Sequence, residues 1–281
     1  MIRSLFLSLC CISILAGQVR VVEDSLTSRS LGRSVRYAVL LPEGYSSSNE
    51  QYAVLYLLHG FNQDHTAWYQ STDLVHELRP LPLIIVSFDA GNSWYVNSAT
   101  VPQDRFDDLF IRDVIPFIDS RYRTKADRSH RFIGGMSMGA YGTLRYALKF
   151  PSLFSVAAAM SPSIQFPAGL EDSAIVARRS AGSNASVRAA FGAVRSAAWD
   201  SSDIMLLARS ADAATAPYII LADGAQDGIP EVVTQTHDLA AILRARTVPF
   251  EMHETPGAHD WKFWQQELRR VLTFLSSRIA R

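Results

Sequence analysis

Short runs of consecutive apolar residues alternate along this chain with stretches whose apolar residues recur every three or four positions. The runs at 53–58, 83–88 and 218–221 suit strands that are buried on both faces of a sheet. The segment 104–122 and the C-terminal segment from Phe263 to Leu275 instead carry a helical apolar stripe. Strands that alternate with helices predict a largely parallel, doubly wound α/β sheet with helices on both faces.

Further elements follow from the same pattern. Pro116 should kink the helix over 104–122, because proline lacks the backbone N–H that a helix interior needs. The remaining expected elements are strands at 34–41, 155–160 and 250–254 and helices at 140–150 and 231–246. The functional side chains of such a sheet gather at the carboxyl ends of its strands.

The segment 163–216 differs from the rest of the chain. It is rich in Ala, Ser and Arg, and it shows mixed helical patterns without a strong strand. We interpret it as helices and loops inserted over the sheet, where they would cap the site. At 281 residues the chain fits a single α/β domain, which we place at 18–281.

The N-terminus indicates export. A short positive region at Met1-Ile2-Arg3 precedes an apolar core that ends near Ala16 and Gly17, which predicts a signal peptide over 1–17 and a secreted or periplasmic protein. The core is shorter than the roughly 20 apolar residues that span a bilayer, so we expect no stable membrane insertion. Both cysteines, Cys10 and Cys11, lie inside this segment, and the mature chain would have no disulfides.

Composition narrows the choice of partners. Hydrophobic residues make up 48% of the chain and charged residues 19%, a balance that supports a large core. The 27 basic and 27 acidic side chains cancel, so nothing in the charge favours a nucleic-acid or acidic-membrane partner.

The strongest chemical motif is Gly135-Met136-Ser137-Met138-Gly139, which matches the G-x-S-x-G pattern of a nucleophile elbow. A β-favouring apolar run precedes it, and an amphipathic helical stretch that stops at Pro151 follows it. Glycines at both ends would let strand and helix pass close together while Ser137 holds an unfavourable backbone conformation. This context favours a serine nucleophile over an idle serine in a glycine-rich turn.

Two loops supply candidate supporting residues. His59-Gly60-Phe61 ends a buried strand, where a hydrolase of this type places one backbone N–H of its oxyanion hole. Phe61 and Met138 are the candidates for that hole, although His59-Gly60 by itself could be an ordinary turn. Trp94 and Tyr95 stand on a loop after the strand at 83–88 and, with His59, are candidate substrate-binding residues or simply loop packing.

In this arrangement the acid and the histidine follow the serine in the sequence. Of the three histidines after Ser137, His237 falls in a helical pattern and His253 in a strand, whereas His259 lies on a loop after the last strand and is the candidate base. The acid should lie after the strand at 218–221. Asp227 is preferred to Asp223 because it stands further out in the turn, with Asp203 and Asp260 as capping or solvated carboxylates.

A neutral imidazole would take the proton of Ser137, and a carboxylate would orient the imidazole. This is ester chemistry with water as the second substrate. It requires no metal and no cofactor, and the scattered histidines form no metal-binding motif.

The chain also resembles a known family at several motifs that occur in order. They are Leu57-Leu58-His59-Gly60, Phe110 to Thr124, Gly135 to Gly142, Phe150 to Phe154, and His259-Asp260-Trp261 with Trp264. These motifs are similar to those of the putative-esterase family of α/β hydrolases, over about residues 30 to 278. The family includes esterase D, tributyrin, feruloyl and acetyl xylan esterases and the mycobacterial mycolyltransferases. Its acid lies in a Gly-x-x-Asp turn, which matches Gly224 to Asp227 and implies Asp227 as the acid.

The details of the resemblance favour one branch of the family. S-formylglutathione hydrolases tend to be cytosolic and have a second histidine where this chain has Trp261, and mycolyltransferases share the Ser93-Trp94-Tyr95 loop but have a different elbow. The His-Asp-Trp ending looks more like tributyrin and feruloyl esterases. The resemblance thus implies a secreted serine carboxylesterase for small acyl or glycan-linked esters, with S-formylglutathione hydrolase and acyltransferase activities as the alternatives.

Overall fold

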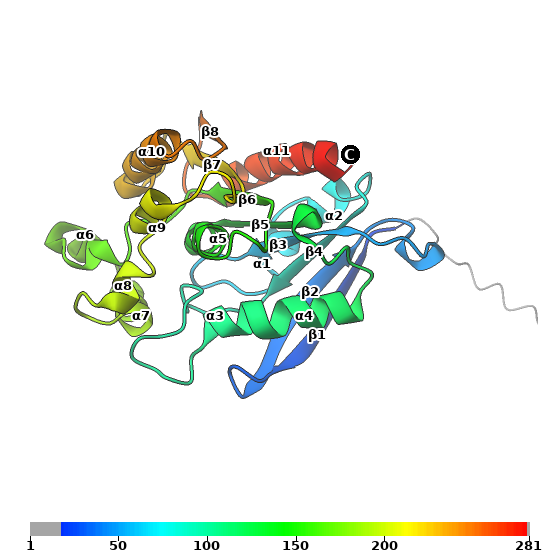
Figure 1. Ribbon diagram of the computed structural model, residues 1–281, viewed down its shortest axis with the longest axis horizontal. Coiled ribbons are helices and arrows are strands. Elements are labelled where there is room, and N and C mark those ends of the chain that lie inside the picture. Colours follow the sequence, from blue (N-terminus) through cyan, green and yellow to red (C-terminus); the bar gives the residue numbers. More distant parts are fainter. Residues whose placement is uncertain (1–17, 280–281) are drawn as a thin grey trace, which may run out of the picture.

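The computed structural model describes residues 18–279, so the predicted signal peptide over 1–17 lies outside the described residues. An eight-stranded sheet runs through the described chain in the order β1-β2-β4-β3-β5-β6-β7-β8 (Figure 1). The strands are β1 (Arg20–Ser28), β2 (Arg33–Leu41), β3 (Ala53–Leu58), β4 (Leu83–Phe88), β5 (Arg131–Met136), β6 (Val156–Met160), β7 (Tyr218–Gly224) and β8 (Phe250–Thr255).

The sheet is antiparallel at one end and parallel elsewhere. β2 pairs antiparallel with both β1 and β4, whereas every neighbouring pair from β4 through β3, β5, β6 and β7 to β8 is parallel. The carboxyl ends of the parallel strands therefore meet at one edge of the sheet, and this edge carries the candidate site.

Helices cover both faces of the sheet. They are α1 (Ala67–Ser71), α2 (Leu74–Glu77), α3 (Phe106–Asp108), α4 (Ile115–Arg121), α5 (Met138–Lys149), α6 (Ser173–Arg178), α7 (Ala181–Phe191), α8 (Ala197–Asp200), α9 (Ile204–Ser210), α10 (Pro230–Ala245) and α11 (Trp261–Ile279). Short 3₁₀ turns occur at η1 (Tyr45–Ser47), η3 (Arg128–His130) and η4 (Ala168–Leu170), and a π-helical segment, η2 (Leu109–Val114), joins α3 to α4.

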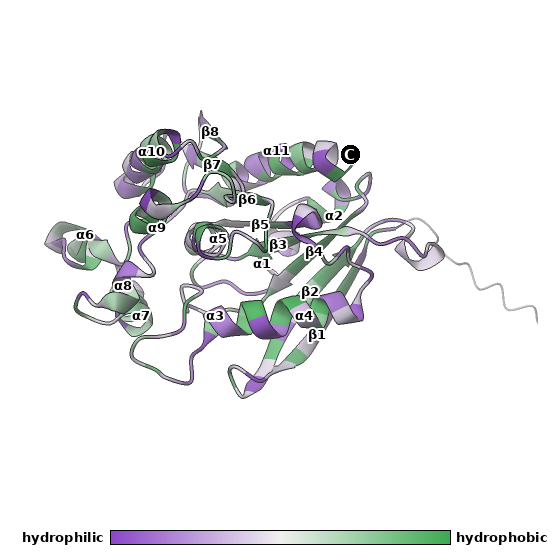
Figure 2. Cartoon of the chain, in the orientation of Figure 1, coloured by the Kyte–Doolittle hydropathy of each residue, from purple (hydrophilic) through white to green (hydrophobic). Residues whose placement is uncertain are grey.

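Successive side chains of β3 point to opposite faces of the sheet, so this one apolar run contributes to two hydrophobic cores. Val54, Tyr56 and Leu58 pack toward the side that holds α5 and α10. Leu55 and Leu57 pack toward the side that holds α1, α2 and α11. Green and purple segments alternate along α4 and α11, because each of these helices buries only one stripe (Figure 2).

Most of the expected elements are present. α1 and α2 were not predicted from the sequence, and two further differences have a physical reason. β1 was not expected, because its residues are mostly polar and exposed; it is an edge strand held by antiparallel pairing with β2. The expected helix over 104–122 is divided into α3, η2 and α4, and Pro116 stands in the first turn of α4. The wide turn of η2 fits a proline just downstream, since a proline ring crowds the carbonyl one turn before it.

The segment between β6 and β7 contains η4 and the helices α6 to α9, and its residues form no strand. Figure 1 shows α6, α7 and α8 together at the left side of the molecule, beyond the strands. Among the described residues, no helix has both the length and the apolar character needed to cross a membrane.

The elbow between β5 and α5 requires glycine for steric reasons. A Cβ on Gly139 would lie 2.3 Å from the carbonyl oxygen of Leu58 and 2.7 Å from that of His59. A Cβ on Gly135 would lie 2.6 Å from the backbone of Gly139. Helix α5 can therefore begin directly against β3 only because these side chains are absent.

This contact predicts a large cost for Gly139→Ala. The added methyl group meets backbone that cannot move aside, so we expect the free energy of unfolding to fall by about 3 kcal/mol. Gly182 in α7 is the matched control, since a Cβ there meets nothing within 4 Å. Gly182→Ala should be neutral or stabilise the protein by up to about 1 kcal/mol. Chemical denaturation measures both, and equal effects would contradict the steric argument.

Candidate active site

Ser137 stands in a strained turn at the end of β5. Its φ is 54°, in the left-handed region that residues with a side chain seldom adopt. The turn is held on both sides, since the Ser137 N–H donates to the carbonyl of Met160 at 2.9 Å and the Ser137 carbonyl accepts from the Tyr141 N–H at 3.0 Å. Backbone strain of this kind persists only where the surrounding structure fixes it. Here it directs the hydroxyl away from the sheet.

His259 connects the serine to a carboxylate. Its Nε2 lies 2.9 Å from Ser137 Oγ, and its Nδ1 lies 2.7 Å from Asp227 Oδ2. A carboxylate only accepts hydrogen bonds, so Nδ1 carries the proton and Nε2 is free to accept from the serine hydroxyl. Asp227 has no exposed side-chain surface, and His259 is 19% exposed. The structure thus brings the three residues expected as a triad into one hydrogen-bonded chain.

The loops that carry Asp227 and His259 are joined directly. The Gln226 N–H donates to the Gly257 carbonyl at 2.9 Å, and the Gly257 N–H donates to Gln226 Oε1 at 2.9 Å. The two backbones lie so close that a Cβ on Gly224 would be 2.4 Å from the Gly257 oxygen. Sequence reasoning missed Gln226, although it lies within the Gly-x-x-Asp turn. These bonds fix the acid relative to the base.

Asp223, the other candidate acid, lies at the end of β7 and does not contact His259. Its side chain is fully buried, and its carboxylate has no hydrogen-bond partner within residues 18–279. Burial, with a contribution from the nearby Glu254 carboxylate, raises the pKa of Asp223 to about 6. Asp227, in contrast, accepts bonds from both His259 and the Ile229 N–H, so the geometry separates the two aspartates.

Phe61 and Met138, the candidates for the oxyanion hole, border the same pocket as Ser137 and His259. Met138 begins α5, so its N–H has no partner within the helix. No hydrogen bond from the Phe61 N–H is found within the described part of the chain. Both groups are thus available to a ligand oxygen near Ser137.

His59 and Tyr95, expected as substrate-binding residues, do not reach the pocket with their side chains. Both are fully buried, and burial lowers the pKa of His59, which favours a neutral ring. His59 Nε2 accepts from the Ala90 N–H at 3.0 Å, and its Nδ1 contacts the Gly60 carbonyl at 2.8 Å. The Tyr95 hydroxyl donates to the His59 carbonyl at 2.9 Å. Through these bonds His59 and Tyr95 hold the loop before Phe61 in place.

A cavity of about 380 Å³ opens above Ser137 and His259. Its walls include the aromatic rings of Phe61, Trp94 and Trp264, so the third expected substrate-binding residue, Trp94, does border it. Trp264 also packs edge-on against the His259 ring, with 5.1 Å between centroids. The helices inserted between β6 and β7 form the opposite wall.

Two polar residues of that wall were not anticipated from the sequence. Gln165 is buried, and neither atom of its amide finds a partner among residues 18–279. The Arg179 guanidinium lies 4.3 Å from the centroid of the Phe166 ring and 5.7 Å from that of Trp94. Both residues border the cavity. Nothing in the local sequence marks them, because their role arises only when the inserted helices fold over the sheet.

Structural comparison supports the fold. A ferulic acid esterase superposes with a TM-score of 0.78 at 24% identity, covering 93% of this chain and 99% of that one. An S-formylglutathione hydrolase of Agrobacterium tumefaciens gives the same TM-score at 19% identity, covering 94% and 97%. The α/β-hydrolase fold expected from the sequence is therefore confirmed.

Sequence comparison identifies the family. An esterase of Mycobacterium tuberculosis is 31% identical over 241 residues, which cover 79% of this chain but only about half, 51%, of the longer relative. An acetyl esterase of Caldicellulosiruptor saccharolyticus is 28% identical over 233 residues, covering 81% of this chain and 85% of the relative. The family model described as "Putative esterase" matches residues 28–275. The chain therefore belongs to this esterase family of α/β hydrolases.

Proposed function

We propose that the chain is a secreted serine carboxylesterase that hydrolyses small acyl or carbohydrate-linked esters through an acyl-enzyme. The observation that carries the proposal is the continuous hydrogen-bonded chain from Asp227 through His259 to Ser137, at the floor of an open cavity. Esterase family membership and the acetyl esterase relative support the reaction class.

The geometry suits each step of acyl transfer. His259 Nε2 accepts the proton of Ser137 Oγ as the oxygen attacks the acyl carbon, and Asp227 stabilises the resulting imidazolium. The negative carbonyl oxygen is stabilised by the N–H groups of Phe61 and Met138. His259 then protonates the leaving alcohol. In the second step His259 removes a proton from water as the water oxygen attacks the acyl carbon, and it returns this proton to Ser137 Oγ as the bond between Ser137 and the acyl group breaks.

The cavity favours an ester that has both apolar and oxygen-bearing parts. Its aromatic walls suit an acyl chain or ring, whereas the unpaired amide of Gln165 and the guanidinium of Arg179 suit hydroxyl or phenolic oxygens. A purely aliphatic ester would leave the buried Gln165 amide without a partner. Acetylated or feruloylated sugars fit these requirements.

The purified mature protein should hydrolyse p-nitrophenyl acetate or butyrate without added metal, because the protein itself supplies nucleophile and base. A spectrophotometric assay with and without EDTA checks this. Loss of activity in EDTA with recovery on addition of Zn²⁺ would contradict the proposed mechanism. A panel of simple acyl esters, methyl ferulate, acetylated xylan and S-formylglutathione then identifies the substrate class. Preference for S-formylglutathione, or for an alcohol acceptor over water, would favour the alternatives.

Substitution of the nucleophile or base should remove almost all catalysis. Ser137→Ala and His259→Ala should each lower kcat by on the order of 10⁶, and the double variant by little more, because the two residues act as one unit. Independent, multiplying losses in the steady-state kinetics would show that they are not partners.

The two aspartates should differ in the same assay. Asp227→Asn should lower kcat by about 10⁴, since an amide favours the wrong imidazole tautomer. Asp223→Asn is the matched comparison and should lose far less, because Asp223 does not contact His259. Reversed sensitivities would overturn the assignment of the acid but leave the serine esterase proposal in place.

Export is the remaining part of the proposal. If residues 1–17 are removed on secretion, mass spectrometry of the protein from its native host should show an N-terminus near Gly17. Intact Met1 in the soluble cytosolic fraction would contradict export and would favour the S-formylglutathione alternative.

A further inference from the structure

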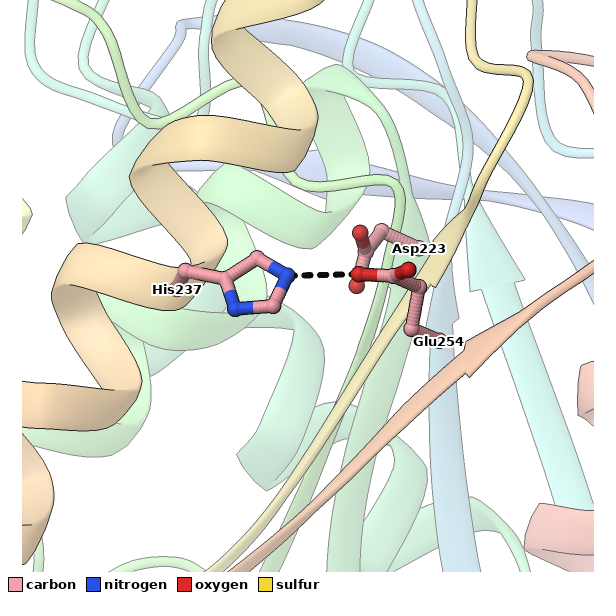
Figure 3. Close-up of side chains that lie close together, drawn as sticks. All are labelled: Asp223, His237 and Glu254. Carbon is pink, nitrogen blue, oxygen red and sulfur yellow. Dashed lines mark hydrogen bonds and ion pairs between the residues drawn. The ribbon is translucent and has the colours of Figure 1, made fainter.

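Three ionisable side chains meet beside the loop that carries Asp227. Figure 3 shows His237 reaching from α10 toward Glu254 of β8, with Asp223 of β7 next to it. Their sequence positions suggest no motif. They lie together because β7 and β8 pair in parallel, with Asp223 opposite Glu254, and because α10 packs across both strands.

The donor atoms are close enough to share one ligand. One nitrogen of His237 and one oxygen each from Asp223 and Glu254 all lie within 4.8 Å of one another. His237 Nε2 and Glu254 Oε2 are 2.6 Å apart and form a hydrogen bond. Both of these side chains are about half exposed, at 54% and 43%, so a solute can reach them.

Asp223 is the observation that calls for a ligand. Its side chain has no exposed surface, and neither carboxylate oxygen has a hydrogen-bond partner in the described part of the chain. Buried polar groups are nearly always paired, and an unpaired buried carboxylate is expensive to maintain. The carboxylate lies in the cluster, beside the imidazole and the second carboxylate. A positive ion at that position would provide the missing partner.

We propose that Asp223, His237 and Glu254 form a binding site for a divalent transition-metal cation of the zinc type, with water completing the coordination. Two carboxylates balance the charge of such an ion, and an imidazole nitrogen distinguishes it from Ca²⁺ and Mg²⁺, which prefer oxygen ligands alone. Zinc bonds to these atoms are about 2.1 Å long, so the donors of one ion lie roughly 3.4 Å apart. Binding therefore replaces the proton between His237 and Glu254 and separates that pair slightly.

The cation would act on the loop and not on the ester. None of the three ligands borders the cavity above Ser137. The ion would instead join β7, β8 and α10, and the turn containing Asp227 runs from β7 to α10. Its expected effect is to stabilise this part of the fold, in agreement with ester hydrolysis that needs no added metal.

Calorimetric titration of the chelator-treated, desalted protein with ZnCl₂ tests the site. We expect about one equivalent to bind with a Kd in the micromolar range or below, and saturating Zn²⁺ to raise the melting temperature by on the order of 5 °C. His237→Ala and Glu254→Gln should abolish both effects. Both side chains are partly exposed, so these variants should fold even if Asp223→Asn does not.

His130→Ala is the matched control. His130 also contacts a carboxylate, with 2.8 Å between Nδ1 and Asp127 Oδ2, but this pair lies at the surface and, among the described residues, belongs to no group of three potential metal ligands. The control should bind Zn²⁺ as the parent protein does. The proposal is overturned if Zn²⁺ does not bind, if binding survives in His237→Ala and Glu254→Gln, or if it is lost in His130→Ala. Titrations with CaCl₂ and MgCl₂ should show much weaker binding, and a preference for either ion would overturn the proposed class of cation.

Discussion

The imidazole of His259 must reach a hydroxyl and a carboxylate that belong to different loops, and the rest of the structure depends on this requirement. Ser137 follows β5, Asp227 follows β7 and His259 follows β8. These strands are joined through consecutive parallel ladders, in which Gly135 pairs with Ala159, Ala159 with Leu221, and Asp223 with Glu254. A slip of one residue in any ladder would turn its side chains to the opposite face. The hydrogen bonds that link Asp227, His259 and Ser137 therefore depend on the register of the sheet.

Packing around the loop that carries His259 holds the imidazole in its position at the site. Trp264 contacts the His259 ring and donates its indole N–H to Ser161 Oγ at 3.2 Å. Trp261 packs edge-on against both Trp264 and Trp68 of α1, so an aromatic series connects the loop to α1 on the same side of the sheet. Such contacts limit the rotation of the imidazole at little entropic cost, because the rings are already fixed by burial. The hydrogen bonds of Gln226 restrain the loop that carries Asp227 in the same way.

Elements that depend on a short stretch of sequence could be predicted, whereas features that depend on contacts between distant segments could not. Local sequence patterns determine β3, β4 and the glycine-flanked elbow after β5. The positions of these elements were therefore predicted. β1 was missed because a polar edge strand is defined by its partner and not by its own pattern. His59 and Tyr95 were placed at the pocket because position after a strand does not reveal which way a side chain points. Gln165, Arg179 and the cluster around Asp223 arise from contacts between distant segments, which no spacing rule could reveal.

The inserted helices also affect how the substrate preference of this protein can evolve. They enter after β6 and return to β7, and they contribute Gln165, Ile175 and Arg179 to the cavity without contributing any strand to the sheet. An ion pair between Arg178 and Glu231 attaches them to α10. Part of the cavity wall thus belongs to a segment that contains none of Ser137, Asp227 and His259. Insertions or substitutions in this segment can yield new ester preferences, while selection on the sheet preserves the reactive centre.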